Sequence, residues 1–145
     1  MRRIIIQSLC LLLSVAVITI AQDNSLRSGD DFPDFWQKFK TAVISGNKES
    51  VAALSRFPLV VSSDKKRTIT IKNSSEFYRK YNQVFKKQTK VADCFANETP
   101  TEDSDTPNTF VAACFDNLGN AIQYYFKKTK TGWKFVEVST FALPD

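Results

Sequence analysis

The sequence predicts an α+β fold in which N-terminal helices pack on one face of a curved, mostly antiparallel sheet. Three observations lead to this prediction. Apolar residues between 32 and 54 recur at helical spacing. A further helical segment, 73–85, crosses between strand-like runs, as in α+β layouts. The chain then closes with three apolar runs joined by short polar turns, and such turns allow only antiparallel pairing.

The first two helices are bounded by residues with special backbone preferences. The inward face of the first helix would carry Phe32, Phe35, Trp36, Phe39, Ala42 and Val43. Gly46 ends this helix because glycine tolerates the left-handed conformation, and Asn47 caps a second, short helix. Pro58 is expected to end the second helix, since the residue before a proline disfavours the α conformation.

A strand and a capped helix are predicted next. The strand starts near Leu59 and is followed by a polar, basic turn over 62–67 and a half-buried strand over 68–72. Asn73 and Glu76 have the spacing of a capping box. The helix that they open has one apolar face, formed by Phe77, Tyr78, Tyr81, Val84 and Phe85.

The remaining chain is predicted to be mostly strand. Residues 91–96 are expected to form a short strand that carries Cys94. Residues 97–108 hold prolines and acids with almost nothing apolar, which indicates a long loop or a flap. Three strands are then predicted over 110–115, 121–128 and 133–141.

The N-terminus has the features of an export signal. Two arginines precede an apolar run that ends in small residues, so 1–21 is predicted to be a cleaved signal peptide. A membrane anchor is the alternative, but a spanning helix needs about 20 apolar residues and no basic cluster follows the run. The prediction is a flexible start over 22–31 and a single domain over 32–145, secreted or periplasmic, with no membrane span after cleavage.

The cysteines agree with export. Cys10 would leave with the signal peptide, so that Cys94 and Cys114 remain as an even pair. In an oxidising compartment such a pair is expected to form a disulfide. Two buried free thiols are the alternative.

Composition excludes several classes of function. The chain has no histidine, which removes Ser-His-Asp and Cys-His nucleophiles and histidine-ligated zinc. Its four glycines are scattered singly, so no phosphate-binding or dinucleotide-binding loop can be built. No cofactor and no metal are therefore expected.

Basic residues gather at 65–67 and at lysines 127, 128, 130 and 134. Nucleic-acid readers show a stronger basic excess interleaved with exposed aromatic residues. These clusters are therefore interpreted as solubilising turns and protection of strand edges, and no nucleic-acid partner is predicted.

The order of the elements and several short motifs resemble a known superfamily. F-W-x-x-F-K-x-A-V precedes a short helix and F-P-L; a capped helix with F-Y-x-x-Y and a meander ending in G-W-K-F-V follow. This pattern, from Phe32 to about Phe141, resembles the nuclear transport factor 2-like superfamily of cystatin-like α+β cones, in particular small exported members of unassigned function. The resemblance implies a curved sheet that wraps a long helix and leaves a pocket at its open end.

The resemblance does not imply an activity, because the superfamily hosts isomerases, dehydratases and binding domains. Steroid-isomerase-like members carry a tyrosine on the first helix, and the first helix of this chain has none. Dehydratase-like members rely on histidines, which are absent here.

The pocket is expected between the first helix and the concave face of the C-terminal sheet. Its candidate lining residues are Trp36, Phe39, Tyr78, Tyr81, Tyr124 and Phe126, because ligand pockets are apolar with a few polar groups. Plain core packing of these aromatic residues is the alternative. Asp93 and Asp116, the acids nearest apolar strands, are weak acid–base candidates, and solvated strand ends or turns are the alternative for them.

Three functional hypotheses follow. The first is an exported, non-catalytic domain that binds a small apolar ligand or a protein partner. The second is a histidine-free acid–base enzyme, isomerase-like or dehydratase-like, that uses the same pocket. The third is an envelope interaction or inhibitor protein that acts through its sheet face or through residues 97–108. A homodimer through the sheet is a further expectation, and Asn73 and Asn97 match the glycosylation acceptor pattern.

Overall fold

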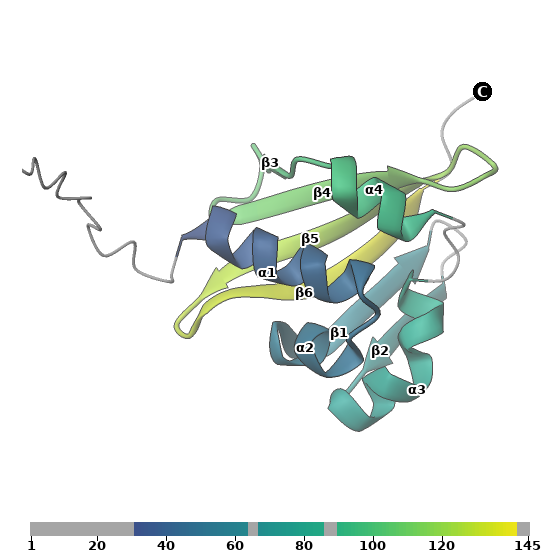
Figure 1. Cartoon of the computed structure of the whole chain (residues 1–145), viewed down its shortest axis with the longest axis horizontal. Helices are drawn as coiled ribbons and strands as arrows, with labels where there is room; N and C mark the ends of the chain where they lie inside the picture. The colour runs from purple at the N-terminus through teal and green to yellow at the C-terminus, as the bar shows by residue number, and fades with distance from the viewer. Residues whose placement is uncertain (1–30, 64–66, 86–89, 142–145) are drawn as a thin grey trace, which may run out of the picture.

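The computed structural model of this chain describes residues 31–63, 67–85 and 90–141 (Figure 1). The expected signal peptide and nearly all of the expected flexible start lie outside the described residues, as do Lys65 and Lys66 of the basic turn. Among the helices in these three ranges, none is both long enough and apolar enough to cross a membrane.

The described residues form helices packed against one curved sheet, which confirms the predicted α+β fold (Figure 1). The helices are α1 (Phe32–Ile44), α2 (Lys48–Ala53), α3 (Ser74–Phe85) and α4 (Val91–Asn97). The strands are β1 (Ser55–Ser63), β2 (Arg67–Ile71), β3 (Thr101–Glu102), β4 (Thr109–Phe115), β5 (Ala121–Thr129) and β6 (Gly132–Phe141). Their order is β2-β1-β6-β5-β4-β3; the pair β1–β6 is parallel and the other pairs are antiparallel. Figure 1 shows α1 across the sheet and α3 beside β2.

The corner between α1 and α2 forms as predicted. Gly46 has a φ of 67°, its N–H donates to the carbonyl of Val43 at 3.1 Å, and the N–H of Asn47 donates to the carbonyl of Ala42 at 2.9 Å. This pair of hydrogen bonds is the Schellman ending of a helix. The Asn47 side chain then accepts a hydrogen bond from the N–H of Ser50 at 2.9 Å, which caps α2.

The predicted cap by Asn73 opens α3, but Glu76 bonds back to Lys72, one residue before the position that a capping box uses. The N–H of Glu76 donates to the side-chain oxygen of Asn73 at 2.9 Å, and the Glu76 carboxylate accepts from the N–H of Lys72 at 2.8 Å. The carboxylate also pairs with Lys80 at 2.6 Å. The hydrogen bond from Lys72, and then that from Lys80, lower the pKa of Glu76. These bonds fix the start of α3 next to the end of β2.

The prediction that Pro58 ends the second helix is wrong. Helix α2 already ends at Ala53, and β1 begins at Ser55, which is paired with Phe135 of β6. The N–H of Phe135 donates to the carbonyl of Leu54 at 3.0 Å, so pairing with β6 draws the chain out of the helix. Pro58 lies inside β1, where the register with β6 is irregular. An irregular register tolerates a residue that has no N–H to donate.

The predicted strand over 91–96 is also wrong, because these residues belong to α4. Helical spacing brings Val91, Cys94 and Phe95 to one face of the helix. The ring of Phe95 is fully buried, with its centroid 5.3 Å from that of Trp36 on α1. In a strand, Cys94 and Phe95 would point to opposite faces, so only a helix allows both residues to face the sheet and α1.

The acidic segment 97–108 is mainly irregular chain, as predicted, but part of it pairs with the sheet. It contains the short strand β3, in which Thr101 and Glu102 pair with the start of β4. The N–H of Asp103 also donates to the carbonyl of Thr109 at 2.9 Å. These bonds hold the segment along the edge of the sheet.

Aromatic side chains fill the space between the helices and the concave face of the sheet. The fully buried ones are Phe39, Phe77, Phe95, Tyr124, Phe126 and Phe135. The ring centroid of Phe39 lies 5.0 Å from that of Phe126 and 5.1 Å from that of Phe135. Tilted and edge contacts of this kind contribute about 0.5–1.5 kcal/mol per pair beyond the burial of area. The space beneath α1 is therefore hydrophobic core.

Cys94 of α4 and Cys114 of β4 form a disulfide, as predicted. Their Cα atoms are 6.0 Å apart, a common separation for such bonds. The bond links α4 to β4. It lies next to Phe95, the residue of α4 that packs in the core.

Candidate functional site

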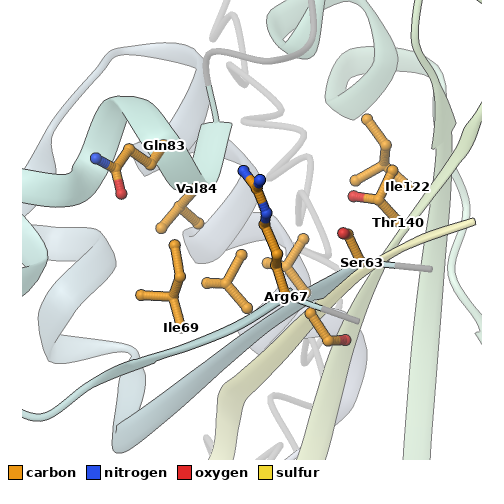
Figure 2. Close-up of a pocket in the computed structure, with 10 residues that line it drawn as sticks. Ser63, Arg67, Ile69, Gln83, Val84, Ile122 and Thr140 are labelled. Carbon is orange, nitrogen blue, oxygen red and sulfur yellow. The ribbon is translucent and has the colours of Figure 1, made fainter. Parts of the chain in front are cut away.

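A cavity of about 380 Å³ opens between α3 and the concave face of the sheet (Figure 2). It lies near the C-terminal ends of β1 and β6, and residues of β2, β5 and α3 form its other walls. The lining residues are Val61, Ser62, Ser63, Arg67, Ile69, Gln83, Val84, Ile122, Val138 and Thr140. We call this space the α3 cavity.

The register of the sheet explains why side chains from three strands line the α3 cavity together. Two rows of paired residues cross the strands, Ile69–Val61–Val138 and Arg67–Ser63–Thr140. The rows are two residues apart on each strand, so that their side chains point to the same face. One row is apolar and the other is polar.

The α3 cavity has an apolar floor and a polar mouth. Val138 and Ile122 are 2% and 3% exposed, and Val84 of α3 is also buried. By contrast, Arg67 and Gln83 are exposed. A ligand would therefore meet hydrocarbon at its inner end and hydrogen-bonding groups at its outer end.

Among the described residues that line the α3 cavity, Arg67 is the only charged one. Figure 2 shows its guanidinium group between Gln83 and Val84 on one side and Ser63 and Thr140 on the other. In the part of the chain that the structure describes, Arg67 forms no ion pair. Arg67 therefore places a positive charge at the mouth of the α3 cavity.

A second hollow lies on the outer side of α1 and α2. Its volume is about 600 Å³, and it is lined by Gln37, Lys38, Thr41, Ala42, Ser45, Asn47, Ser50, Ala53 and Leu54. Most of these side chains are polar, and the hollow is a shallow groove. The α3 cavity, which has a buried apolar floor, is the better site for a small ligand.

The six aromatic candidates lie away from both spaces. Trp36, Phe39, Tyr81, Tyr124 and Phe126 are at most 7% exposed and belong to the hydrophobic core, whereas Tyr78 is 36% exposed. None of the six lines the α3 cavity or the groove. The hydroxyl of Tyr81 has no hydrogen-bond partner among the described residues, and burial raises the pKa of its phenol.

The two acidic candidates are also outside the α3 cavity. Asp93 is exposed in the first turn of α4. Asp116 organises the turn between β4 and β5: its carboxylate accepts hydrogen bonds from the side chain and N–H of Asn120 and from the N–H of Leu118, at 2.8–2.9 Å. The side-chain bond from Asn120 is the main cause of the lowered pKa of Asp116. These bonds indicate a structural role for Asp116.

Sequence reasoning missed Arg67 and Ser63, because both were assigned to a solvated turn. A signal was present in the alternation of Arg67, Ile69 and Ile71. This period of two puts the arginine on the same face as two apolar residues, one of which, Ile71, is only 1% exposed.

Comparisons with known proteins give no function for this chain. No family model matches the sequence, and no curated protein matches it significantly. An NTF2-like protein with a cystatin-like fold from Novosphingobium aromaticivorans has 14% identity and a TM-score of 0.44, over 83% of this chain and 84% of its own. An NTF2-like protein of unknown function from Shewanella oneidensis has 10% identity and a TM-score of 0.47, over 78% and 98%.

A DUF4783 family protein from Bacteroides ovatus has 8% identity and a TM-score of 0.49, over 74% of this chain and 94% of its own. Likeness at this level concerns the arrangement of the chain alone, so the function has to be argued from the α3 cavity itself.

Proposed function

We propose that this protein is a non-catalytic binding domain that holds a small, largely apolar ligand in the α3 cavity. The observation that carries the proposal is the combination of volume and lining. A volume of about 380 Å³ is in the usual range of small-molecule sites, about 300–1,000 Å³. Five of the lining side chains are aliphatic, namely Val61, Ile69, Val84, Ile122 and Val138.

The lining favours binding over acid–base catalysis. A general acid or base has to lie within hydrogen-bond reach of the reacting group. The described residues that line the α3 cavity include no carboxylate, no thiol and no tyrosine. The acid–base hypothesis based on Asp93 or Asp116 therefore has no support at this site.

Closure of the α3 cavity is expected to abolish binding of an apolar probe. We expect the neutral dye N-phenylnaphthylamine to bind the wild-type protein saturably, with a rise in fluorescence. Ile69→Trp, which places an indole in the cavity, should remove most of this rise. Thr70→Trp is the matched control, because Thr70 is exposed on the opposite face of the same strand.

Equal dye binding by the two tryptophan variants, or no saturable binding by the wild type, would contradict the proposal. Circular dichroism of both variants should be recorded alongside, so that loss of binding can be separated from loss of fold.

We also propose that the protein works outside the cytoplasm after removal of a signal peptide. The apolar N-terminal run and the Cys94–Cys114 disulfide support this proposal. N-terminal sequencing of protein isolated from its own host should find a chain that begins at or near Gln22. Stable, membrane-embedded protein that retains Met1 would be evidence against it.

A further inference from the structure

We propose that the ligand of the α3 cavity is a monocarboxylic acid with an apolar body, whose carboxylate is bound by Arg67. This inference rests on the proposed binding function and adds the chemical class of the ligand. It is argued from the position of Arg67, from its polar neighbours and from the direction of burial in the cavity.

The position of Arg67 is set by the sheet. Arg67 is paired with Ser63 of β1, in the polar row at the mouth of the α3 cavity. Its side chain points to the concave face, as Figure 2 shows, and not to the face that the neighbouring Thr68 occupies. An anion at the mouth would not have to displace any described carboxylate from Arg67.

The polar neighbours of Arg67 suit a carboxylate. A guanidinium group presents parallel N–H donors that match the two oxygens of a carboxylate. Ser63, Thr140 and Gln83 line the same mouth and can donate further hydrogen bonds. Among the described lining residues, Arg67 supplies one positive charge, which balances the single charge of a carboxylate. A phosphate monoester carries more negative charge than Arg67 alone offsets.

The direction of burial sets the orientation of the ligand. Hydrocarbon binds most favourably where it leaves water completely, which is at the floor formed by Val84, Ile122 and Val138. The charged head then lies at the mouth beside Arg67, where water still solvates it in part. A cationic head would meet like charge there, and a neutral head would gain only ordinary hydrogen bonds.

An inward-pointing charge on an edge strand can also serve only to prevent edge-to-edge pairing of sheets, and β2 is an edge strand. The two roles predict different results. Edge protection depends on charge alone and does not distinguish between ligands. Carboxylate binding requires that Arg67 discriminate between ligands that differ only in their head group.

The test is competition against bound N-phenylnaphthylamine by octanoate, octanol, octylamine and octyl phosphate, which share one hydrocarbon chain. With the wild-type protein, octanoate should displace the dye at a roughly tenfold lower concentration than octanol. Octylamine should be weaker than octanol, and octyl phosphate no better than octanoate. This arm needs no variant.

The variant arm uses Arg67→Gln and, as a control of equal charge change, Arg79→Gln. Arg79 is exposed on α3 and does not line the α3 cavity. Arg67→Gln should bring octanoate to the level of octanol and leave octanol unchanged, whereas Arg79→Gln should behave like the wild type. Arg67→Lys should retain part of the preference, because the charge remains but the paired donors are lost.

The outcomes separate the two proposals. If neither the dye nor octanol binds, the binding function itself fails. If both bind but octanoate has no advantage, or Arg67→Gln retains that advantage, the carboxylate inference is overturned and the binding function stands. A clear preference for octyl phosphate would overturn the carboxylate as the head group, and a preference for octylamine would overturn an anionic head altogether.

Discussion

Replacement of Tyr124 by alanine is expected to lower the free energy of unfolding by about 3–5 kcal/mol, as large-to-small substitutions of buried aromatic residues do. Tyr124 is 0% exposed. Its ring stacks on that of Phe85 at a centroid distance of 5.7 Å and meets the ring of Phe95 edge-on at 5.0 Å. Alanine would leave a cavity that these rings, fixed by α3 and α4, cannot close.

Tyr78→Ala is the matched control in a denaturant melt. Tyr78 has the same side chain and was an equally strong pocket candidate in the sequence, but it is 36% exposed on α3. Its removal should cost clearly less, closer to the roughly 0.5 kcal/mol that is usual for surface changes. A similarly small cost for both variants, or a loss of dye binding with little loss of stability in Tyr124→Ala, would mean that Tyr124 is a pocket wall and not core.

Loss of the Cys94–Cys114 disulfide is expected to cost about 3 kcal/mol by the chain-entropy model, since it closes a loop of about 20 residues. The physical cause lies mainly in the unfolded chain, which gains freedom once the loop is open. A native-state cost is added, because α4 is then held to the sheet only by packing of Phe95 and its neighbours. Denaturant melts with and without a reducing agent measure the total.

The control for the disulfide is the double variant Cys94→Ala/Cys114→Ala. It should be less stable than the oxidised wild type by a similar amount, and a reducing agent should not change its stability further. An oxidised wild type that melts at the same denaturant concentration as the double variant would contradict the prediction. Labelling of both thiols in denatured, unreduced protein would show that the bond had not formed.

Local chemistry predicted much of the fold. The Gly46 corner, the Asn47 cap and the Asn73 cap depend on residues within five positions of each other, and all three form. The aromatic face of α1 was also predicted residue by residue, since helical spacing defines it without knowledge of the partner.

The errors occurred where distant parts of the chain decide the local structure. Residues 91–97 have a composition that suits either a strand or a helix. The packing of Phe95 against α1 and the disulfide from Cys94 to β4 favour the helix. Pro58 was expected to break a helix, but pairing with β6, which lies some eighty residues later in the chain, had already ended it. Neither partner can be identified from the local sequence.

The sequence by itself determined the fold class, the caps, the disulfide pair and the buried face of α1, because these follow from short-range spacing and from side-chain chemistry. Only the tertiary structure decided where an empty space remains. Aromatic side chains of α1 fill the concave face beneath that helix. Beneath α3, beside the polar row of β1, β2 and β6, the side chains are smaller and leave the α3 cavity. An aromatic residue belongs to the core or lines a cavity according to the volume that its neighbours leave around it. That volume is set only when the helices and strands pack together.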